Sequence, residues 1–559
     1  MVLPPNDRRT AARNFRIQLA NDRFAELFNP HTVNGDESHP DRIANFTKGL
    51  AHHPTTGEPN AIDYDALKAA LDTTQTAPDK LIPIEGITVS AQFDRKYVNP
   101  IAGLSFAIEG ADSHHRTQPP APTLNSEEAA AEMAELYWMA LLRDIDFDDY
   151  HRRNEVQEAV DALNAEFPTI ISGPFWPKDS AGNLTHKSIF RGVTPGDNVG
   201  PYISQFLLKG TKDELLDRDE NDGYVKYGAT EIDQRIVVGK KRLDYMTDFQ
   251  SWLKVQNGVN TFKEPLNDNN AEYFDRKKRF IRNFRDLSTY VHFDALYQAY
   301  LTACLYLLTA EYPLSPTNRY PLSPTNPYLN LMKQAGFGTL GDPHILALVP
   351  EVATRALQAV WLQKWYVHRR LRPEAFGGLI HVHKSGIKNY AGVINDKILS
   401  SSVLDKVKIR NKKINEDHNR GNEGTYLLSQ AFSEGSPMHP SYVAGHATVA
   451  GACVTILKAW FDESAKIRNP VQANEEGDHL NDYNGPDKNN LTVGGELNKL
   501  ASNIAIGRNG AGVHYRSDYT ESIRLGEEIA HTILVELKEA LAEKPNFQYT
   551  SFFGGVKTI

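Results

Sequence analysis

Residues 439–461 read HPSYVAGHATVAGACVTILKAWF, and the later part of this stretch has the composition of an apolar helix. We expect the helix to run over Ala447–Phe461, directly after Gly445 and His446. The first N–H groups of a helix have no partner within it, and the helix dipole makes that end electropositive. A glycine there lets an anion approach closely. The stretch therefore predicts an anion-binding helix N-terminus, with His439 and His446 able to line the same cavity.

Helical periodicity extends outward from this stretch over much of the chain. Ser126 is the expected N-cap of a helix that starts SEEAAAEM, with acidic residues in its first turn. Alternation typical of strands is best at Gly86–Ala91 and Arg235–Val238. The pattern predicts a mainly α fold with at most a minor sheet. Further helices are expected at Glu155–Glu166, Phe274–Asn283, Phe293–Ala310, Val352–Leu371 and Tyr519–Leu541.

The composition is that of an ordinary globular protein. Of the 559 residues, 40% are hydrophobic and 23% charged, and the net charge of −9 argues against nucleic acid or an anionic membrane as a partner. The two cysteines, Cys304 and Cys453, lie in apolar stretches and are expected to be buried thiols. The N-terminus has no apolar signal segment, and we find no membrane span, so a cytoplasmic location is expected.

The chain is expected to divide near residue 340. Residues 1–120 are polar with little periodicity, which predicts irregular structure and short helices. Residues 1–340 should pack against the rest and take part in oligomer contacts, while residues 341–559 form a helical half with the chemical motifs. An acidic loop at 217–223, DRDENDG, lacks the Gly and Glu spacing of an EF-hand. It leaves open an irregular site for a structural divalent cation such as calcium.

Residues 364–373, KWYVHRRLRP, place Lys364 and Arg372 eight positions apart. On a predicted helix, eight residues make a little over two turns, so both side chains project from similar faces. Pro373 is expected to end that helix and to fix Arg372 near its last turn. Taken alone, the segment fits a solvated basic helix face equally well.

Residues 508–518, RNGAGVHYRSD, add Arg508 and His514, which a glycine-rich loop is expected to connect. A long helix should begin near Asp518, whose carboxylate can accept a hydrogen bond from one ring nitrogen of His514. That bond would fix the tautomer and raise the basicity of the other nitrogen. A histidine oriented in this way can coordinate a metal or attack phosphorus. The alternative is that Asp518 only caps the helix and that His514 has no chemical role.

The three segments together suit a tetrahedral oxyanion such as phosphate or vanadate. Lys364, Arg372 and Arg508 can neutralise its oxygens, with forked N–H donors from Arg and a mobile charge from Lys. Histidine adds a neutral nitrogen lone pair and a proton that can be transferred near neutral pH.

The order K-x7-RP, HPSYxxGHA and R-x5-H-x3-D resembles the vanadium-dependent haloperoxidase and type-2 acid phosphatase superfamily. The Lys-to-Arg spacing and the HPSY sequence resemble the bromoperoxidases of red algae and cyanobacteria. Residues 45–57, 200–208 and 341–352 are also similar to that group, so the resemblance covers most of the chain. It implies a mainly helical fold with two four-helix bundles and a large homo-oligomer.

The resemblance also implies roles for individual residues. By position, His514 would be the histidine that binds vanadate. His446 would be the acid–base residue, and His439 would tune proton transfer and the halide pocket. Lys364 would also act in catalysis by polarising the peroxide. The groups expected to bind the vanadate oxygens are Lys364, Arg372, Arg508 and the Gly445 N–H.

The implied activity is that of a vanadate-dependent bromoperoxidase, which uses hydrogen peroxide to oxidise a halide to hypohalous acid. Its partners would be hydrogen peroxide, bromide (or iodide or chloride) and an organic acceptor that becomes halogenated. The sequence indicates neither the halide preference nor the natural acceptor.

One position departs from the family pattern, which usually has Ser immediately before the Gly-His pair. Here that residue is Ala444, which cannot donate a hydroxyl hydrogen bond. Loss of such a bond to a charged acceptor costs about 1.5–3 kcal/mol unless water or backbone replaces it. Ala444 leaves open an acid phosphatase that uses the same pocket, with His514 as nucleophile and His446 as leaving-group acid. A non-enzymatic phosphate- or vanadate-binding oligomer is the third interpretation.

Overall fold

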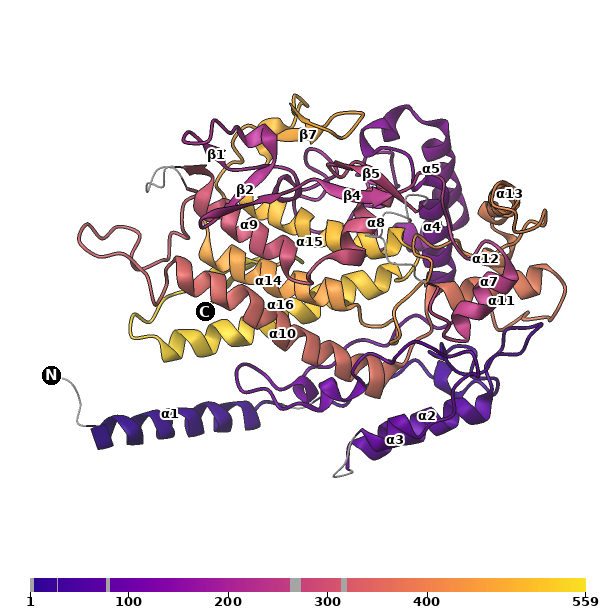
Figure 1. Ribbon diagram of the computed structural model, residues 1–559. Helices are drawn as coiled ribbons and strands as arrows, with labels where there is room; N and C mark the ends of the chain where they lie inside the picture. Colours follow the sequence, from indigo (N-terminus) through magenta and orange to yellow (C-terminus); the bar gives the residue numbers. More distant parts are fainter. Residues whose placement is uncertain (1–4, 28, 77–80, 262–272, 313–318) are drawn as a thin grey trace.

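The computed structural model of the protein describes residues 5–27, 29–76, 81–261, 273–312 and 319–559. Helices dominate these residues, and each sheet has only two strands (Figure 1). The prediction of a mainly α fold with minor β structure is therefore confirmed.

The centre of the fold is helix α14 (Gly445–Trp460), which is buried along almost its whole length. It packs against α10 (Asp342–Leu362), α15 (Val493–Gly510) and α16 (Arg516–Ala540), and these four helices form one bundle (Figure 1). Gly451 of α14 faces Gly526 of α16, and a side chain at either position would collide with the backbone of the other helix. The two glycines therefore set how closely α14 and α16 approach.

A second helical group surrounds α4 (Glu127–Leu142), which contacts α5 (Asn154–Glu166), α12 (Asp396–Ser400) and α13 (Val403–Asp417). The Ser126 hydroxyl accepts the Ala129 N–H at 3.1 Å, so Ser126 caps α4 as the sequence predicts. Two further helices pack on the first group: α8 (Phe284–Phe293) contacts α15, and α9 (Gln298–Thr309) contacts α10. Both groups consist of helices, in keeping with the expected mainly helical, bundled fold.

The remaining elements are short or peripheral, apart from one long helix near the N-terminus. That helix, α1 (Pro5–Phe24), lies along the lower edge of the molecule in Figure 1, and its 20 residues exceed the short helices expected in this part of the chain. The other helices are α2 (Ala61–Thr74), α3 (Ile82–Glu85), α6 (Pro168–Ile171), α7 (Phe249–Gln256) and α11 (Pro373–Lys384). Each strand pairs with one other strand.

The strand pairs are β1 (Lys212–Asp213) with β6 (Glu311–Tyr312), β2 (Tyr224–Tyr227) with β3 (Thr230–Asp233), β4 (Ile236–Gly239) with β5 (Phe274–Arg279), β7 (Val471–Ala473) with β8 (Leu480–Asp482), and β9 (Gln548–Thr550) with β10 (Val556–Thr558). Of these five pairs, β1 with β6 is parallel and the others are antiparallel.

Some predicted elements are wrong. Phe274–Asn283 is not a helix: Phe274–Arg279 forms β5, which pairs with β4, and Asn283 caps α8. Gly86–Ala91 forms no strand, and no neighbouring strand pairs with it. Arg235–Val238 is confirmed as the core of β4, shifted by one residue. The expected helix at Phe293–Ala310 is in fact the end of α8, a break and α9.

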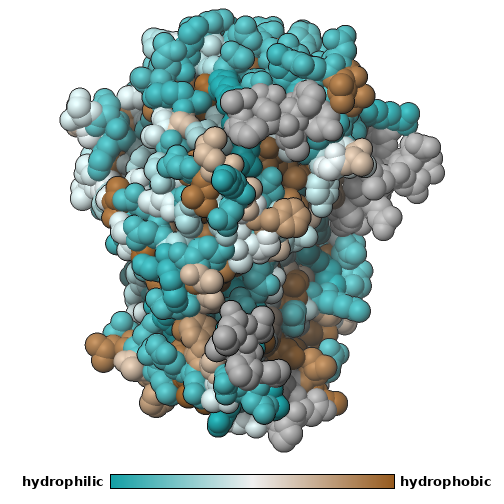
Figure 2. All heavy atoms as spheres, turned by 90° about the vertical axis from the view of Figure 1, so that its left-hand side faces the viewer, coloured by the Kyte–Doolittle hydropathy of each residue, from teal (hydrophilic) through white to brown (hydrophobic). Residues whose placement is uncertain are grey.

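The hydrophobic core is continuous across residue 340. One buried cluster includes Leu136 and Leu287 from the first part of the chain and Val454 and Ile504 from the second. Cys304 and Cys453 are buried free thiols, as expected. The stretch Asp342–His368 is long and apolar enough to cross a membrane by length and composition alone, but 50% of its most apolar window is buried within the fold. Figure 2 shows one side of the molecule, where hydrophilic surface is interrupted by separate apolar patches.

Candidate functional site

The three sequence segments meet at the N-terminus of α14. Lys364 Nζ donates to the carbonyl oxygens of Pro440 at 2.6 Å and Ser441 at 2.7 Å. Arg372 Nε donates to the carbonyl oxygen of His439 at 3.0 Å. Both cations therefore hold the backbone that leads into α14.

The Arg372 guanidinium joins two histidines. Its Nη1 lies 3.0 Å from His514 Nε2, and its Nη2 lies 2.9 Å from His439 Nδ1. A guanidinium can only donate hydrogen bonds, so both ring nitrogens must carry lone pairs. Nη1 also donates to the Val513 carbonyl oxygen at 2.9 Å. Arg372 therefore brings His439 and His514 to one point.

Asp518 orients His514, as the sequence predicts. His514 Nδ1 donates to Asp518 Oδ2 at 2.7 Å, which leaves the Nε2 lone pair toward the cations. Ser441 Oγ donates to the same carboxylate oxygen at 2.5 Å, and Arg370 Nη1 donates to Oδ1 at 2.8 Å. Burial alone would raise the pKa of Asp518, but Arg370, His514 and Ser441 together hold it below its ordinary value. Asp518 is therefore an anion that neutralises only one of the surrounding cations.

Arg508 completes the cation group from α15. Its Nη1 donates to the Val291 carbonyl oxygen at 2.7 Å, and its guanidinium lies 5.5 Å from the centre of the Phe432 ring. The buried Nε of Arg508 has no hydrogen-bond partner within the described part of the chain. Buried charged groups are normally paired, so an unsatisfied donor here indicates that an acceptor belongs at this site.

The electrostatics of the three cations also favour an anion. Burial and the neighbouring Arg372 lower the pKa of Lys364 well below its ordinary value. Burial and Arg508 lower the pKa of Arg372 to about 9, and burial lowers that of Arg508 to about 10. An anion among them would relieve this repulsion. Together with the Nε2 lone pair of His514 and the α14 N-terminus, the donor set fits a tetrahedral oxyanion with one nitrogen ligand.

His446 lies in the first turn of α14 and pairs with a residue of another helix. Its Nε2 lies 3.1 Å from Asp294 Oδ1, at the C-terminal end of α8. Burial lowers the pKa of His446, although Asp294 opposes the shift. The lowered pKa favours the neutral imidazole, which can exchange a proton beside the helix N-terminus.

His439 lies on the other side of the group. Its ring centre is 5.0 Å from that of Trp361 on α10, and burial, Lys364 and Arg372 lower its pKa well below the ordinary value. Gly445 begins α14, and a side chain there would approach the Trp361 ring to 3.6 Å.

Ala444 is the N-cap of α14 and provides no side-chain cap. Its N–H donates to Ser522 Oγ at 2.7 Å. The Ser522 hydroxyl in turn donates to the Asp518 backbone oxygen, so it is committed to the protein and does not replace the hydroxyl that Ala444 lacks.

The local structure differs from the prediction at two cations. Lys364 and Arg372 do not share a helix: Lys364 lies in a π-helical turn, Gln363–His368, and Arg369 then has a left-handed φ of 42°. Pro373 begins α11 instead of ending a helix, with Arg372 as N-cap, because proline suits the first helical turn. Arg508 lies near the C-terminal end of α15, and a short segment with Gly512 then connects it to His514, as expected.

Sequence reasoning missed several residues that support the site. Asp294 pairs with His446, Ser441 binds Asp518, and Arg370 Nη2 donates to Glu132 Oε2 at 3.0 Å. Ser441 lies within the HPSY segment and Arg370 within the basic segment, so their places in these motifs could have identified them as residues that support the site. Asp294 and Glu132 lie far away in sequence with no motif around them.

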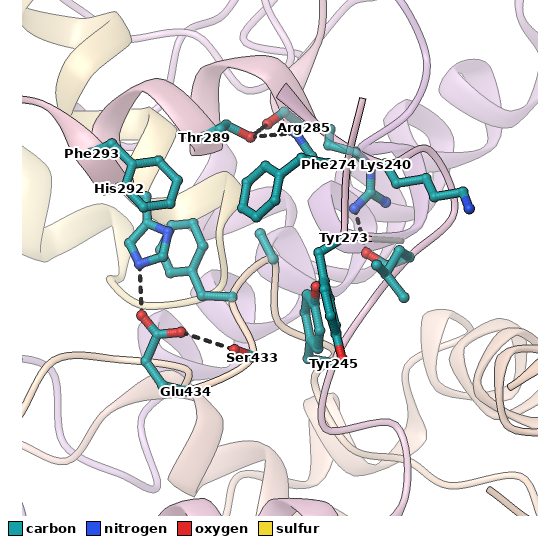
Figure 3. A pocket seen from close by; sticks show the side chains of 14 residues that line it. Lys240, Tyr245, Tyr273, Phe274, Arg285, Thr289, His292, Phe293, Ser433 and Glu434 are labelled. Carbon is teal, nitrogen blue, oxygen red and sulfur yellow. Dashed lines mark hydrogen bonds and ion pairs between the residues drawn. The ribbon is translucent and has the colours of Figure 1, made fainter. Parts of the chain in front are cut away.

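Beside the site lies a small aromatic pocket between the end of α8 and residues 431–434 (Figure 3). His292 Nε2 lies 2.6 Å from Glu434 Oε1, and the His292 ring stacks on Phe432 with ring centres 3.8 Å apart. Phe432 also faces Arg508, so it separates this pocket from the anion site. The pocket contains none of the residues expected to act in catalysis.

No group of three or more His, Cys, Asp or Glu side chains in the described ranges is arranged to hold a metal ion. In the acidic loop at 217–223, Asp219 caps a short turn and Glu220 pairs with Lys209. These carboxylates are thus used within the protein.

Comparison with known proteins places these features in a family. Residues 410–543 match the model of the VCPO second helical-bundle domain. The vanadium-dependent bromoperoxidase of Corallina officinalis is 40% identical, covering 97% of this chain and 95% of the relative. That of Ascophyllum nodosum is 34% identical, covering 99% of this chain and 92% of the relative. The homohexameric second vanadate-dependent bromoperoxidase (AnII) of Ascophyllum nodosum superposes with a TM-score of 0.86 at 28% identity, covering 99% of this chain and 90% of that chain.

Proposed function

The chain belongs to the family of vanadium-dependent bromoperoxidases, and from this membership we propose that it binds vanadate at the N-terminus of α14. The observation that carries the proposal is the buried group of Lys364, Arg372 and Arg508 around the unprotonated Nε2 of His514, which lies 3.0 Å from Arg372 Nη1. His514 would be the nitrogen ligand. The three cations and the Gly445 N–H would hold the oxygens.

The reaction is oxidation of bromide by hydrogen peroxide to hypobromous acid, which halogenates an organic acceptor. When bound, vanadate supplies a Lewis-acidic centre that activates hydrogen peroxide. Two backbone carbonyl oxygens hold the Lys364 ammonium beside the site. Its positive charge there neutralises the negative charge that develops during the reaction. His446 takes up and returns a proton, with Asp294 to orient its ring. His439, against Trp361, tunes this transfer and borders the halide site.

The test is bromination of a phenolic dye by metal-free protein with peroxide and bromide, before and after addition of orthovanadate. We expect vanadate to restore bromination. Hydrolysis of p-nitrophenyl phosphate is measured in parallel. Ester cleavage that vanadate inhibits, without bromination, would identify an acid phosphatase; Ala444, which lacks the usual hydroxyl, is the feature that favours this second candidate. Binding of both anions without turnover would indicate a non-enzymatic binding protein.

We propose that the chain forms a homo-oligomer, since its structural neighbour is a homohexamer. Large apolar side chains are exposed on the N-terminal part, among them Phe24, Leu27, Phe106 and Ile108. Such exposure is typical of residues that pack in an interface. Light scattering during size-exclusion chromatography would give the subunit number, and a monomer would contradict the proposal.

Three narrower proposals accompany this function. Residues 1–340 support the site while 341–559 contain the vanadate-binding motifs, which limited proteolysis and separate expression would test. A structural divalent cation such as calcium would appear in metal analysis of the purified protein. The protein acts in the cytoplasm, which fractionation of the source cells would test.

A further inference from the structure

Ser441 connects all three chemical segments of the site. Its N–H donates to the Arg370 carbonyl oxygen at 3.0 Å, and its own carbonyl oxygen accepts Lys364 Nζ at 2.7 Å. Its hydroxyl donates to Asp518 Oδ2 at 2.5 Å. Every polar atom of this fully buried residue is therefore used by a residue of the other two segments.

The hydroxyl bond reaches the carboxylate oxygen that orients His514. Asp518 Oδ2 accepts Ser441 Oγ, His514 Nδ1 at 2.7 Å and the Tyr515 N–H at 3.2 Å. Ser441 Oγ is also 3.4 Å from His514 Nδ1. The hydroxyl thus lies against both members of the His–Asp pair and limits how the carboxylate can turn.

We propose that Ser441 is a positioning residue for the nitrogen ligand of vanadate, acting through Asp518 on His514. The inference rests on the proposed function, since it concerns how His514 meets vanadate. The other carboxylate oxygen is already fixed by Arg370 Nη1 at 2.8 Å, so Ser441, at a shorter distance than the Tyr515 N–H, supplies the main protein anchor of Oδ2 besides His514 itself. Partners that orient a metal-binding histidine typically contribute a factor of about 10–100 in affinity.

A purely structural role predicts a different outcome. If Ser441 only maintained the packing of the cation group, its loss would weaken every oxyanion alike. The cations attract phosphate and vanadate by the same charges and hydrogen bonds. Only vanadate needs the His514 nitrogen as a metal ligand, so a positioning role should affect vanadate selectively.

The experiment compares binding of orthovanadate and inorganic phosphate to metal-free protein by calorimetry, without peroxide or halide. For Ser441→Ala we expect vanadate affinity to fall by about 10–100-fold, with phosphate affinity changed less than about 3-fold. Ser441→Cys keeps the size and a weak donor, so its vanadate affinity should be intermediate. The cysteine variant also tests the proposal if the alanine variant does not fold. Ser502→Ala is the matched control, because Ser502 is buried and its hydroxyl likewise donates to a carboxylate, Asp197 Oδ2 at 2.8 Å, that is not one of the groups expected to bind vanadate.

The outcomes separate the inference from the proposed function. Unchanged vanadate affinity in Ser441→Ala, or an equal loss for vanadate and phosphate, would overturn the positioning role while the proposed function stands. A wild-type protein that binds phosphate but not vanadate would overturn both. A selective loss for vanadate, absent in Ser502→Ala, would establish Ser441 as the positioning residue.

Discussion

Arg372 Nη1 lies 3.0 Å from His514 Nε2, so the ring nitrogen that faces the cations of the site is the unprotonated one. The proton is on Nδ1, which donates to Asp518 at 2.7 Å. This tautomer has its lone pair where three cations, one of them with an unsatisfied N–H group, surround the N-terminus of α14. An unprotonated ring nitrogen and a group of anion-binding cations thus coincide, which suits vanadate with one nitrogen ligand and equally suits a phosphatase with His514 as nucleophile.

His514→Ala is expected to abolish vanadate binding. The substitution removes the nitrogen ligand, while Lys364, Arg372 and Arg508 remain. Vanadium content after dialysis of the loaded protein measures the effect, and circular dichroism checks the fold. His344→Ala, a histidine at the start of α10, serves as a control that should keep its vanadium. If the His514 variant still holds stoichiometric vanadium, the ligand assignment is wrong.

His446→Ala is expected to retain vanadate and to lose most of its turnover. General acid–base groups contribute about 10²–10⁴-fold to rate, so kcat should fall within that range. Asp294→Asn keeps a group that can bond to His446 Nε2 at the observed 3.1 Å but removes its charge, so a smaller loss is expected. Steady-state bromination with vanadium content determined in the same samples measures both. Unchanged rates in His446→Ala would rule out its acid–base role.

The sequence predicted which residues come together better than it predicted the path of the chain around them. The apolar run after His446 is long and uninterrupted, so α14 was predicted to within two residues of its start and one of its end. The Lys364–Arg372 spacing fitted a continuous helix, but Arg369 at φ 42° breaks it. A break of this kind depends on tertiary contacts: the Arg369 guanidinium is held by Glu37, far away in sequence.

Sequence patterns did not predict the pairs that form between residues far apart in the chain. Asp294 follows a helix of ordinary composition, and nothing local indicates that its carboxylate meets His446, 152 positions later. The FDRKKR segment was predicted to be helical but forms the strand β5. Its partner strand β4 lies some 35 residues earlier, so the pairing that stabilises it cannot be read from the segment itself. Short charged segments of this kind take their structure from whatever they pair with.

Ala444→Ser is expected to tighten vanadate binding. A hydroxyl bonded to a charged acceptor is worth about 1.5–3 kcal/mol, which corresponds to roughly 10-fold or more in affinity. Ala444 is also the N-cap of α14, where Ser can instead cap the helix and stabilise the fold by about 0.5–2 kcal/mol. Calorimetric vanadate titration and urea unfolding of the metal-free protein distinguish the two effects. No change in affinity would mean that another donor already fills this role.

Acid is expected to destabilise the fold through its buried histidines. Burial lowers the pKa of His381, which is 7% exposed, from 6.5 to about 4. Between these pH values the unfolded chain binds a proton that the folded protein does not. This residue therefore lowers the free energy of unfolding by about 1.4 kcal/mol per pH unit as pH falls from 6.5 to 4, and has no such effect above 6.5.

Urea unfolding between pH 4.5 and 7.5 would measure this slope, and His381→Gln should make it shallower by about that amount. His479→Gln is the control, because the His479 side chain is 66% exposed. Equal slopes in the wild type and His381→Gln would contradict the assignment.

Lys48→Met is expected to impair both stability and catalysis, because Lys48 links the N-terminal part to the site. Its Nζ donates to Glu374 Oε1 at 2.7 Å and to the carbonyl oxygens of Glu434 at 2.9 Å and Ser436 at 2.7 Å. Glu374 follows Arg372 by two residues, and Ser436 precedes His439 by three. Lys48 therefore fixes the segments that carry an anion-binding cation and a site histidine.

Both side chains of the pair are buried, so removal of Lys48 leaves the Glu374 charge uncompensated and should cost about 3–5 kcal/mol in unfolding free energy. Lys48→Met combined with Glu374→Gln should recover much of the stability but not the turnover, since the loop carbonyls stay unbound. Lys68→Met removes an exposed ion pair of α2 with Asp72 and should change stability by less than about 1 kcal/mol. If the double variant regains full bromination after vanadate loading, Lys48 stabilises the fold without positioning the site.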